Sequence, residues 1–169
     1  TCYVVHRLDM ETSGAVLFAK NPFILPILNR LLEDKMIQRQ YWALTEGKFQ
    51  TKKTVYKDKI GRDRHDRRKR VVDPRKGQSA YTTVTRLKTF EGASLVNCQL
   101  KTGRTHQIRV HLSHHGHAIL GDPLYSHQPA SRLMLHAHSL SFTHPLTLEK
   151  VTVKVKSESF EQVLRNHKS

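Results

Sequence analysis

Short segments rich in β-branched, aliphatic and aromatic residues recur along this chain, and polar or glycine-containing turns separate them. They lie at residues 3–5, 15–19, 40–45, 80–87, 94–100, 133–142 and 151–155. Helical spacing of apolar residues is found in only three places. The chain has 169 residues, enough for one core, and no internal repeat or linker divides it. Many strands with few helices predict a single α+β domain.

Three residues that commonly cap helices precede the three helical segments. They are Asn21, Thr105 and Ser157. The first helix is expected to run to about Met36, the second to end just before Gly116, and the third to span about ten residues. Rows of apolar side chains at every fourth position make the first helix amphipathic, so we expect it to pack on the sheet.

The charge of the chain is strongly unbalanced. It has 29 Lys and Arg against 14 Asp and Glu, which gives a formal net charge of +15 and a pI near 10.2. A field of this sign attracts polyanions, and RNA or DNA is the commonest such partner. A membrane surface is the weaker alternative, because no basic amphipathic helix is visible and the apolar runs are too short to span a bilayer.

Much of the positive charge lies in one segment. Residues 57–76 hold ten Lys or Arg and four Asp, with almost nothing apolar. Such a segment is either a solvated basic loop or an arm that grips phosphates and becomes ordered on RNA. The charge of the whole chain favours the arm.

The two cysteines, Cys2 and Cys98, form no metal-binding motif and lie in strand-like segments. We expect buried or half-buried free thiols, which fit a reducing, cytoplasmic compartment.

The chain begins at Thr1, without Met and close to an apolar strand. We therefore expect it to be a fragment of a longer protein, and a monomer by default.

Residues 6–14 place a carboxylate beside a guanidinium and follow them with small, turn-forming residues. Apolar segments on both sides predict a strand, a tight polar turn and a second strand, with Asp9 at the mouth of the turn. The neighbouring Arg7 would keep Asp9 ionised. Taken alone, this pair is most often a surface salt bridge at a hairpin, so a functional role for Asp9 depends on other segments.

Residues 101–112 crowd basic and polar side chains into a turn and the first half of a helix. A helix N-terminus attracts anions through its free N–H groups, and Arg104 at the turn would strengthen that attraction. Arg109 lies one helical turn further on and could instead point at a fixed carboxylate. Arginine is preferred over lysine where a permanently charged, bidentate partner is needed.

Tyr41 lies in the strand-like segment 40–45. Strand alternation predicts that its side chain faces away from that of Trp42 and toward the same side as that of Ala43. From the residues alone, a half-buried strand tyrosine is the simplest interpretation.

The spacing of His111 and His115, four residues apart, can bind a metal. The glutamate of the metalloprotease motif is absent, however, and no third ligand stands at a recognisable distance. We therefore expect no metal, and we interpret these histidines as part of a basic, RNA-facing helix. No phosphate loop, dinucleotide-binding glycine motif or Ser-His-Asp spacing occurs either.

Six motifs in a fixed order resemble those of one enzyme family, the RluA-type RNA pseudouridine synthases. They are His6-Arg7-Leu8-Asp9 with Thr12-Ser13-Gly14, Gln40-Tyr41-x-Ala43, residues 103–112, Gly116-His117-x-Ile119-x-Gly121-Asp122-x-x-Tyr125, Leu135-His136-Ala137 and Phe142-x-His144-Pro145. The resemblance covers nearly the whole chain. It implies the pseudouridine-synthase fold, a mixed, mostly antiparallel sheet flanked by helices with a central RNA-binding cleft. Residues 1–169 would be the catalytic domain, without the N-terminal part that family members usually carry.

The resemblance also implies roles for individual residues. Asp9 matches the catalytic aspartate, Tyr41 the active-site tyrosine that stacks on the uracil and assists proton removal at C5, and Arg109 the basic residue paired with the aspartate. Arg7 would bind RNA and occupy the place of the flipped nucleotide. Together with the basic turn, the resemblance places substrate and RNA binding at Arg7, Arg104, His106, Gln107 and Leu135.

The implied reaction converts specific uridines of ribosomal or transfer RNA to pseudouridine. The bond from C1′ to N1 breaks and a bond from C1′ to C5 forms, so nothing is added or lost and no cofactor is expected. A carboxylate could attack C1′ or add to C6 of the base. The target base must be extruded from folded RNA, which a basic groove would favour. The alternative is a non-catalytic RNA-binding module or RNA chaperone with the same fold.

Overall fold

The computed structural model describes residues 1–169, and a seven-stranded sheet organises it. One of the seven strands, β2 (Ser13–Gly14), pairs parallel to a neighbour, and every other pairing in the sheet is antiparallel. The other six follow the order β11 (Lys150–Lys154), β10 (Leu135–Thr143), β4 (Gln38–Glu46), β9 (Ala93–Leu100), β8 (Thr82–Phe90) and β5 (Lys53–Tyr56). The predicted mixed, mostly antiparallel sheet is thus confirmed.

The first segment of the chain forms a hairpin, as predicted, but a short one. Strands β1 (Tyr3–Val4) and β3 (Phe18–Ala19) pair antiparallel. The residues between them do not make a simple turn, because β2 leaves the hairpin and pairs with β10. A Cβ atom at Gly14 would lie only 2.3 Å from the carbonyl oxygen of Ala137, and the φ of Gly14 is +132°, so only glycine fits there.

Three helices form where they were predicted, with different ends. Helix α1 (Ile24–Glu33) starts after Asn21, whose side-chain oxygen accepts the backbone N–H groups of residues 23 and 24 at 3.0 and 2.9 Å. It ends three residues before Met36, and Lys35 takes a positive φ of 61°. Helix α3 (Glu158–Asn166) is capped by Ser157, as predicted. None of the three helices has the length and apolar character needed to cross a bilayer.

Helix α2 (Gln107–His114) corrects one prediction. Thr105 does not cap it. The residue before the helix is His106, which takes a left-handed conformation with φ 56°, and no side chain caps the backbone there. The side chain of Gln107, the first residue of the helix, instead reaches back and accepts the N–H of Arg104 at 3.1 Å. Gly116 ends the helix with φ 82°, as predicted.

The basic segment 57–76 forms a hairpin, and its role as an arm that grips phosphates stays a prediction. Strands β6 (Ile60–Arg62) and β7 (Arg70–Val72) pair antiparallel. Ile60 is buried against Ala80 and Val110, which anchors the hairpin to the rest of the molecule. Three of its four aspartates accept backbone N–H groups of the turns, which explains how so charged a segment keeps one conformation.

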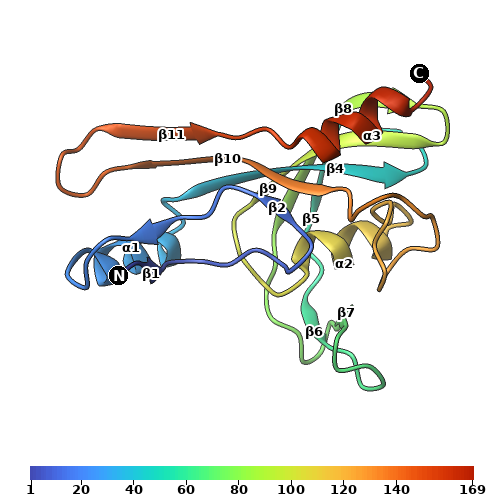
Figure 1. Cartoon of the computed structure of the whole chain (residues 1–169). Helices are drawn as coiled ribbons and strands as arrows, with labels where there is room; N and C mark the ends of the chain where they lie inside the picture. The colour runs from blue at the N-terminus through green and yellow to red at the C-terminus, as the bar shows by residue number, and fades with distance from the viewer.

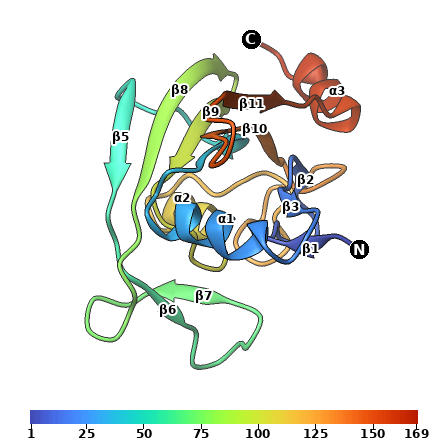
Figure 2. The ribbon, with the colours of Figure 1, turned by 90° about the vertical axis from the view of Figure 1, so that its left-hand side faces the viewer.

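The elements form a curved sheet with α1 and α2 on the same side of it (Figures 1 and 2), and the basic hairpin β6–β7 projects beyond α2. Side chains of the sheet, α2 and α3 form the main core, and α1 packs with β1, β3 and the end of β10 in a smaller one. Cys98 is fully buried, which raises the pKa of its thiol to about 12. Cys2 is free too but exposed, contrary to expectation, because β1 starts only at Tyr3.

Candidate active site

All eight residues predicted for catalysis or RNA binding line one small pocket of about 60 Å³. Three parts of the chain build it. They are the loop between β1 and β2, the start of β4 with the facing end of β10, and the turn that leads into α2. The predicted residues among its lining are Arg7, Asp9, Tyr41, Arg104, His106, Gln107, Arg109 and Leu135.

Asp9 faces the pocket and pairs with Arg109, one hundred residues further along the chain. Its Oδ2 atom lies 3.3 Å from Nη1 of Arg109, and its side chain keeps 26% of its surface exposed. The structure contains no ion pair between Asp9 and Arg7, whose side chain is exposed. The interpretation as a hairpin salt bridge is therefore wrong, since the loop turns Asp9 away from its neighbour in sequence.

Arg109 is itself held by a second carboxylate, Asp122. Its Nε and Nη2 atoms donate to the two oxygens of Asp122 at 2.8 Å each, and both side chains are buried. Burial disfavours the charge of Arg109, but the two carboxylates outweigh this and raise its pKa. Arg109 therefore remains a fixed cation that presents one N–H group to Asp9.

The role of Asp122 was not predicted from the sequence, although the motif Gly121-Asp122-x-x-Tyr125 contains it. Its Oδ1 atom also accepts the N–H groups of Leu124 and Tyr125, at 3.0 and 3.3 Å. A carboxylate that caps its own turn while it binds an arginine is fixed in position. The turn sequence Gly121-Asp122-Pro123 was the available signal, because aspartate commonly accepts backbone N–H groups of its own turn.

Tyr41 is buried on β4 and lines the pocket beside Asp9. The predicted alternation holds, because Ala43 is buried in the same core while the ring of Trp42 stacks on His138 at 4.5 Å. Burial raises the pKa of Tyr41, the nearby Arg39 opposes this, and Asp9 adds to it. The phenol is therefore protonated at neutral pH.

His106 connects the pocket to the basic hairpin. Its Nδ1 atom lies 2.8 Å from the hydroxyl of Tyr125, and that hydroxyl accepts the backbone N–H of Arg70 on β7 at 2.8 Å. The hydroxyl can donate its own proton to His106 when Nδ1 of the ring carries none. Burial lowers the pKa of His106, as does the charge of Arg109, so the ring is neutral and can accept that proton.

Gln107 is buried and uses its whole amide within the protein. Its oxygen accepts from Thr102 Oγ1 and Arg104 N, and its nitrogen donates to Tyr81 O and Thr82 Oγ1, all at 2.7 to 3.1 Å. The predicted contact with RNA thus finds no free polar group at Gln107. The geometry fits a residue that shapes the turn before α2.

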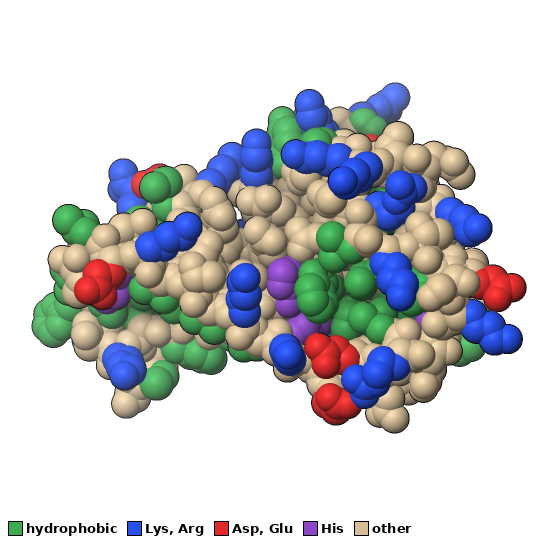
Figure 3. Space-filling model, turned by 90° about the horizontal axis from the view of Figure 1, so that it is seen from above, with side chains coloured by type: hydrophobic (Ala, Val, Ile, Leu, Met, Phe, Trp, Pro, Cys, Tyr) green, Lys and Arg blue, Asp and Glu red, His purple; other side chains and the backbone are tan.

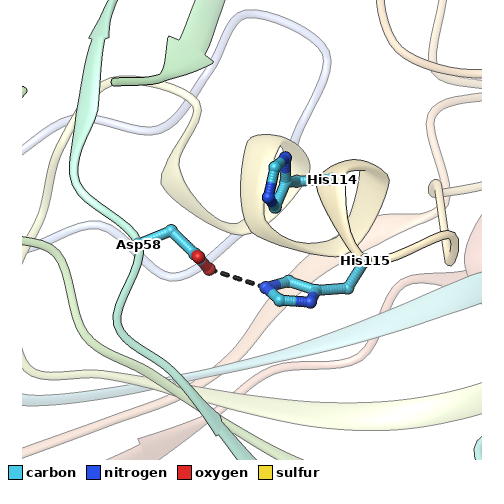
Figure 4. Close-up of side chains that lie close together, drawn as sticks. All are labelled: Asp58, His114 and His115. Carbon is cyan, nitrogen blue, oxygen red and sulfur yellow. Dashed lines mark hydrogen bonds and ion pairs between the residues drawn. The ribbon is translucent and has the colours of Figure 1, made fainter. Parts of the chain in front are cut away.

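The histidines at the end of α2 are divided between two environments. His111 is buried and bonds to Thr82 Oγ1 and to the backbone oxygen of Asp58. His114, His115 and Asp58 lie together (Figure 4), with one potential ligand atom of each within 4.8 Å of the others. Asp58 could be the third metal ligand that the sequence did not identify. Its Oδ2 atom, however, already forms a hydrogen bond with Nε2 of His115 at 2.6 Å. The absence of a metal stays a prediction.

A wider groove of about 850 Å³ opens from the pocket. The two share Asp9, Arg39 and the turn 103–106, and the groove continues past Lys35 at the end of α1 and Lys101. A third depression, of about 430 Å³, joins the basic hairpin to Arg104 and Thr105. On the far face of the molecule, Lys and Arg side chains are spread over the surface with few acidic ones among them (Figure 3).

Comparison with known proteins assigns the family. A family model described as RNA pseudouridylate synthase matches residues 1–114. The chain is 45% identical over 160 residues to the uncharacterized RNA pseudouridine synthase YhcT of Bacillus subtilis, which covers 91% of this chain and 53% of that protein. It is 38% identical over 172 residues to ribosomal large subunit pseudouridine synthase D of Neisseria meningitidis, covering 88% of this chain and 43% of that protein.

A solved structure agrees. The human RNA pseudouridylate synthase domain containing 1 superposes with a TM-score of 0.83 at 28% identity, over 93% of this chain and 69% of that one. The chain therefore belongs to the RNA pseudouridylate synthase family and has its fold, as its motifs predicted. It spans about half the length of the curated relatives it matches.

Proposed function

We propose that residues 1–169 form the catalytic domain of an RNA pseudouridine synthase, and that Asp9 is its catalytic group. The observation that carries this proposal is the ion pair of Asp9 with a buried arginine inside a pocket that Tyr41 also lines. Arg109 donates a hydrogen bond to the carboxylate and holds it in place, and the clamp of Asp122 prevents the arginine from moving away.

The reaction needs one nucleophile and one proton transfer. If Asp9 attacks C1′, the C1′–N1 bond breaks, the base turns, and C5 then displaces the carboxylate from C1′. If Asp9 instead adds to C6, the C1′–N1 bond breaks, the turned base joins C5 to C1′, and the carboxylate is eliminated from C6. The hydrogen leaves C5, and N1 gains one, so the product is an isomer of the substrate. Because the reaction is balanced without another reactant, the proposal includes no cofactor and no metal.

Tyr41 contributes by position. Its ring is held at the base of the pocket, where it can stack on the uracil, and its phenol can donate a hydrogen bond. Removal of the C5 proton by Tyr41 would require a phenolate, which the raised pKa disfavours. We therefore propose stacking and hydrogen bonding as its main roles. Leu135 lines the pocket beside it.

The substrate is proposed to be ribosomal or transfer RNA. The net charge of +15 attracts it, and the basic hairpin supplies Arg62, Arg70 and Lys76 along a depression that reaches Arg104 at the rim of the pocket. The exposed Arg7 is placed to occupy the position of the extruded base. We further propose that the protein acts as a monomer in the cytoplasm.

Release of tritium from RNA labelled at C5 of uridine tests this function. Unmodified transcripts of ribosomal and transfer RNA, made with [5-³H]uridine, should release tritium when the protein is added. Tritium is released because C5 loses its hydrogen when it becomes bonded to C1′. A protein that binds both transcripts in a salt-dependent way but releases no tritium would instead be the non-catalytic RNA-binding module.

A further inference from the structure

Three buried side-chain atoms of the whole structure have no hydrogen-bond partner, and all three belong to the active-site region. They are Nδ1 of His6, Oγ1 of Thr12 and Nε of Arg39. His6 and Arg39 line the wide groove, and Thr12 and Arg39 line the pocket. Because buried polar groups are nearly always paired, these three atoms at one site are available to hydrogen-bond a polar group that enters it.

Arg39 is the most costly of the three, because it carries a charge. Its side chain makes no ion pair, and no neighbour accepts a hydrogen bond from its buried Nε. Burial lowers its pKa, and the nearby Tyr41 offsets this only in part. The buried Arg109, by contrast, has two carboxylates. Because Arg39 is partly buried and has no carboxylate partner, it is free to bind an anion from the groove.

The surroundings of Arg39 hold its end in place. Its guanidinium lies against Gly103, where an added Cβ atom would stand 2.9 Å from Nη1 and 3.4 Å from Nη2. His6 is also close, and its pKa is lowered to about 4 by burial first and then by the charge of Arg39, so it adds no second charge at neutral pH. Arg39 lies at the junction of the pocket and the groove, because it lines both.

We propose that Arg39 binds a phosphate of the RNA backbone next to the target uridine. This inference rests on the proposed RNA substrate. Its basis is position: a base that occupies the pocket leaves its own phosphates at the pocket mouth, where Arg39 lies. The planar guanidinium matches a phosphate bidentately, and phosphate is the anion that RNA brings. Lys35 and Lys101 continue the path along the groove for the next phosphates.

Salt-dependent binding of a simple RNA tests the subsite. The probe is a fluorescein-labelled octauridylate, and its Kd is measured by anisotropy over a series of KCl concentrations. Loss of one phosphate contact in Arg39→Gln should weaken binding about tenfold at low salt. It should also reduce the slope of log K against log salt by about 0.7. Gly103→Ala, which displaces the guanidinium without removing charge, should weaken binding in the same direction.

Arg165→Gln is the matched control, because it removes the same charge from α3, outside the pocket and groove. An unchanged slope in Arg39→Gln, or an equal change in Arg165→Gln, would overturn the subsite. Thermal unfolding confirms that each variant is folded. Asp9→Asn separates the two proposals, because it should abolish pseudouridine formation and leave the slope unchanged. Absence of tritium release from the wild type would refute the catalytic function alone.

Discussion

The two walls of the active-site pocket use their polar groups in opposite ways. The wall built by α2 consists of Gln107 and Arg109 with Asp122, and we call it the closed wall. Each of these side chains has its hydrogen bonds inside the protein. Folding alone completes this wall, so it can hold the catalytic carboxylate in position before any substrate arrives.

The other side, where the pocket opens into the wide groove, consists of His6, Thr12 and Arg39, and we call it the open wall. Each of its members leaves one buried polar atom without a partner. Such atoms cost free energy in the folded protein, and a bound substrate can repay this cost by hydrogen bonding. The comparison teaches that substitutions on the closed wall should damage stability, whereas some substitutions on the open wall should improve stability while they damage binding.

The largest effect is expected at the clamp of the closed wall. Asp122→Ala leaves the buried Arg109 with only the partly exposed Asp9 as a partner. Breaking a buried pair from one side should lower the free energy of unfolding by about 3 kcal/mol or more. Urea denaturation measures this, and a loss below about 1 kcal/mol would show that the closed wall does not depend on its clamp.

A pH effect is expected from His6 on the open wall. Its pKa is about 4 in the folded protein and 6.5 in a free side chain. Between these values the unfolded chain binds a proton that the native one excludes, so stability is complete above pH 6.5 and is lost as the pH falls toward 4. The loss from His6 should reach about 3 kcal/mol.

His138 has a similar lowered pKa and contributes in the same window. The measurement is therefore the difference between wild type and His6→Gln, by urea denaturation from pH 7 to pH 4. The variant should lose less stability than the wild type on acidification. Parallel curves would refute a neutral, buried His6.

Gln107 should show a smaller effect on the closed wall. Gln107→Leu keeps much of the volume but leaves up to four partner groups of the turn without a bond. We expect a loss of about 2 kcal/mol, with weaker catalysis as the turn 102–106 loosens. If RNA affinity fell without any loss of stability, Gln107 would contact RNA, as the sequence had predicted.

The smallest effect has the opposite sign. Arg39→Met removes an unpaired, half-buried charge and fills its place with an apolar chain, so it should raise the free energy of unfolding by about 1 kcal/mol. The same variant should bind RNA less tightly. A decrease in stability would show that Arg39 is a structural residue of β4, and would remove the contrast between the two walls.

Sequence patterns located the strands and helices of this molecule better than they predicted the contacts between them. Segments 80–87 and 94–100 predicted β8 and β9, because the pattern of apolar residues that marks a strand is visible within a short stretch of sequence. The basic hairpin was missed, because its order depends on Ile60 packing against two distant residues. The periodicity of apolar residues locates a helix or strand, but it does not show which distant residues that element packs against.

The same limit applies to the site. Asp9, Tyr41 and Arg109 were found through their motifs, and the structure places them in one pocket. Asp122 and Arg39 were missed. The ion pair of Asp122 with Arg109 and the lack of a partner for Nε of Arg39 arise only in the folded chain. Nearness in sequence suggested Arg7 as the partner of Asp9, whereas the family motif implied Arg109, and the structure contains the pair with Arg109.

The central claim is that Asp9, held by the closed wall, performs the chemistry. Asp9→Asn preserves the shape of the side chain and removes its nucleophilic charge. The measurement is tritium release from [5-³H]uridine transcripts, with octauridylate binding measured on the same preparation. The account predicts a loss of activity of at least about a thousandfold, equivalent to about 4 kcal/mol, with RNA affinity nearly unchanged. Turnover by the variant at a rate close to that of the wild type would contradict it.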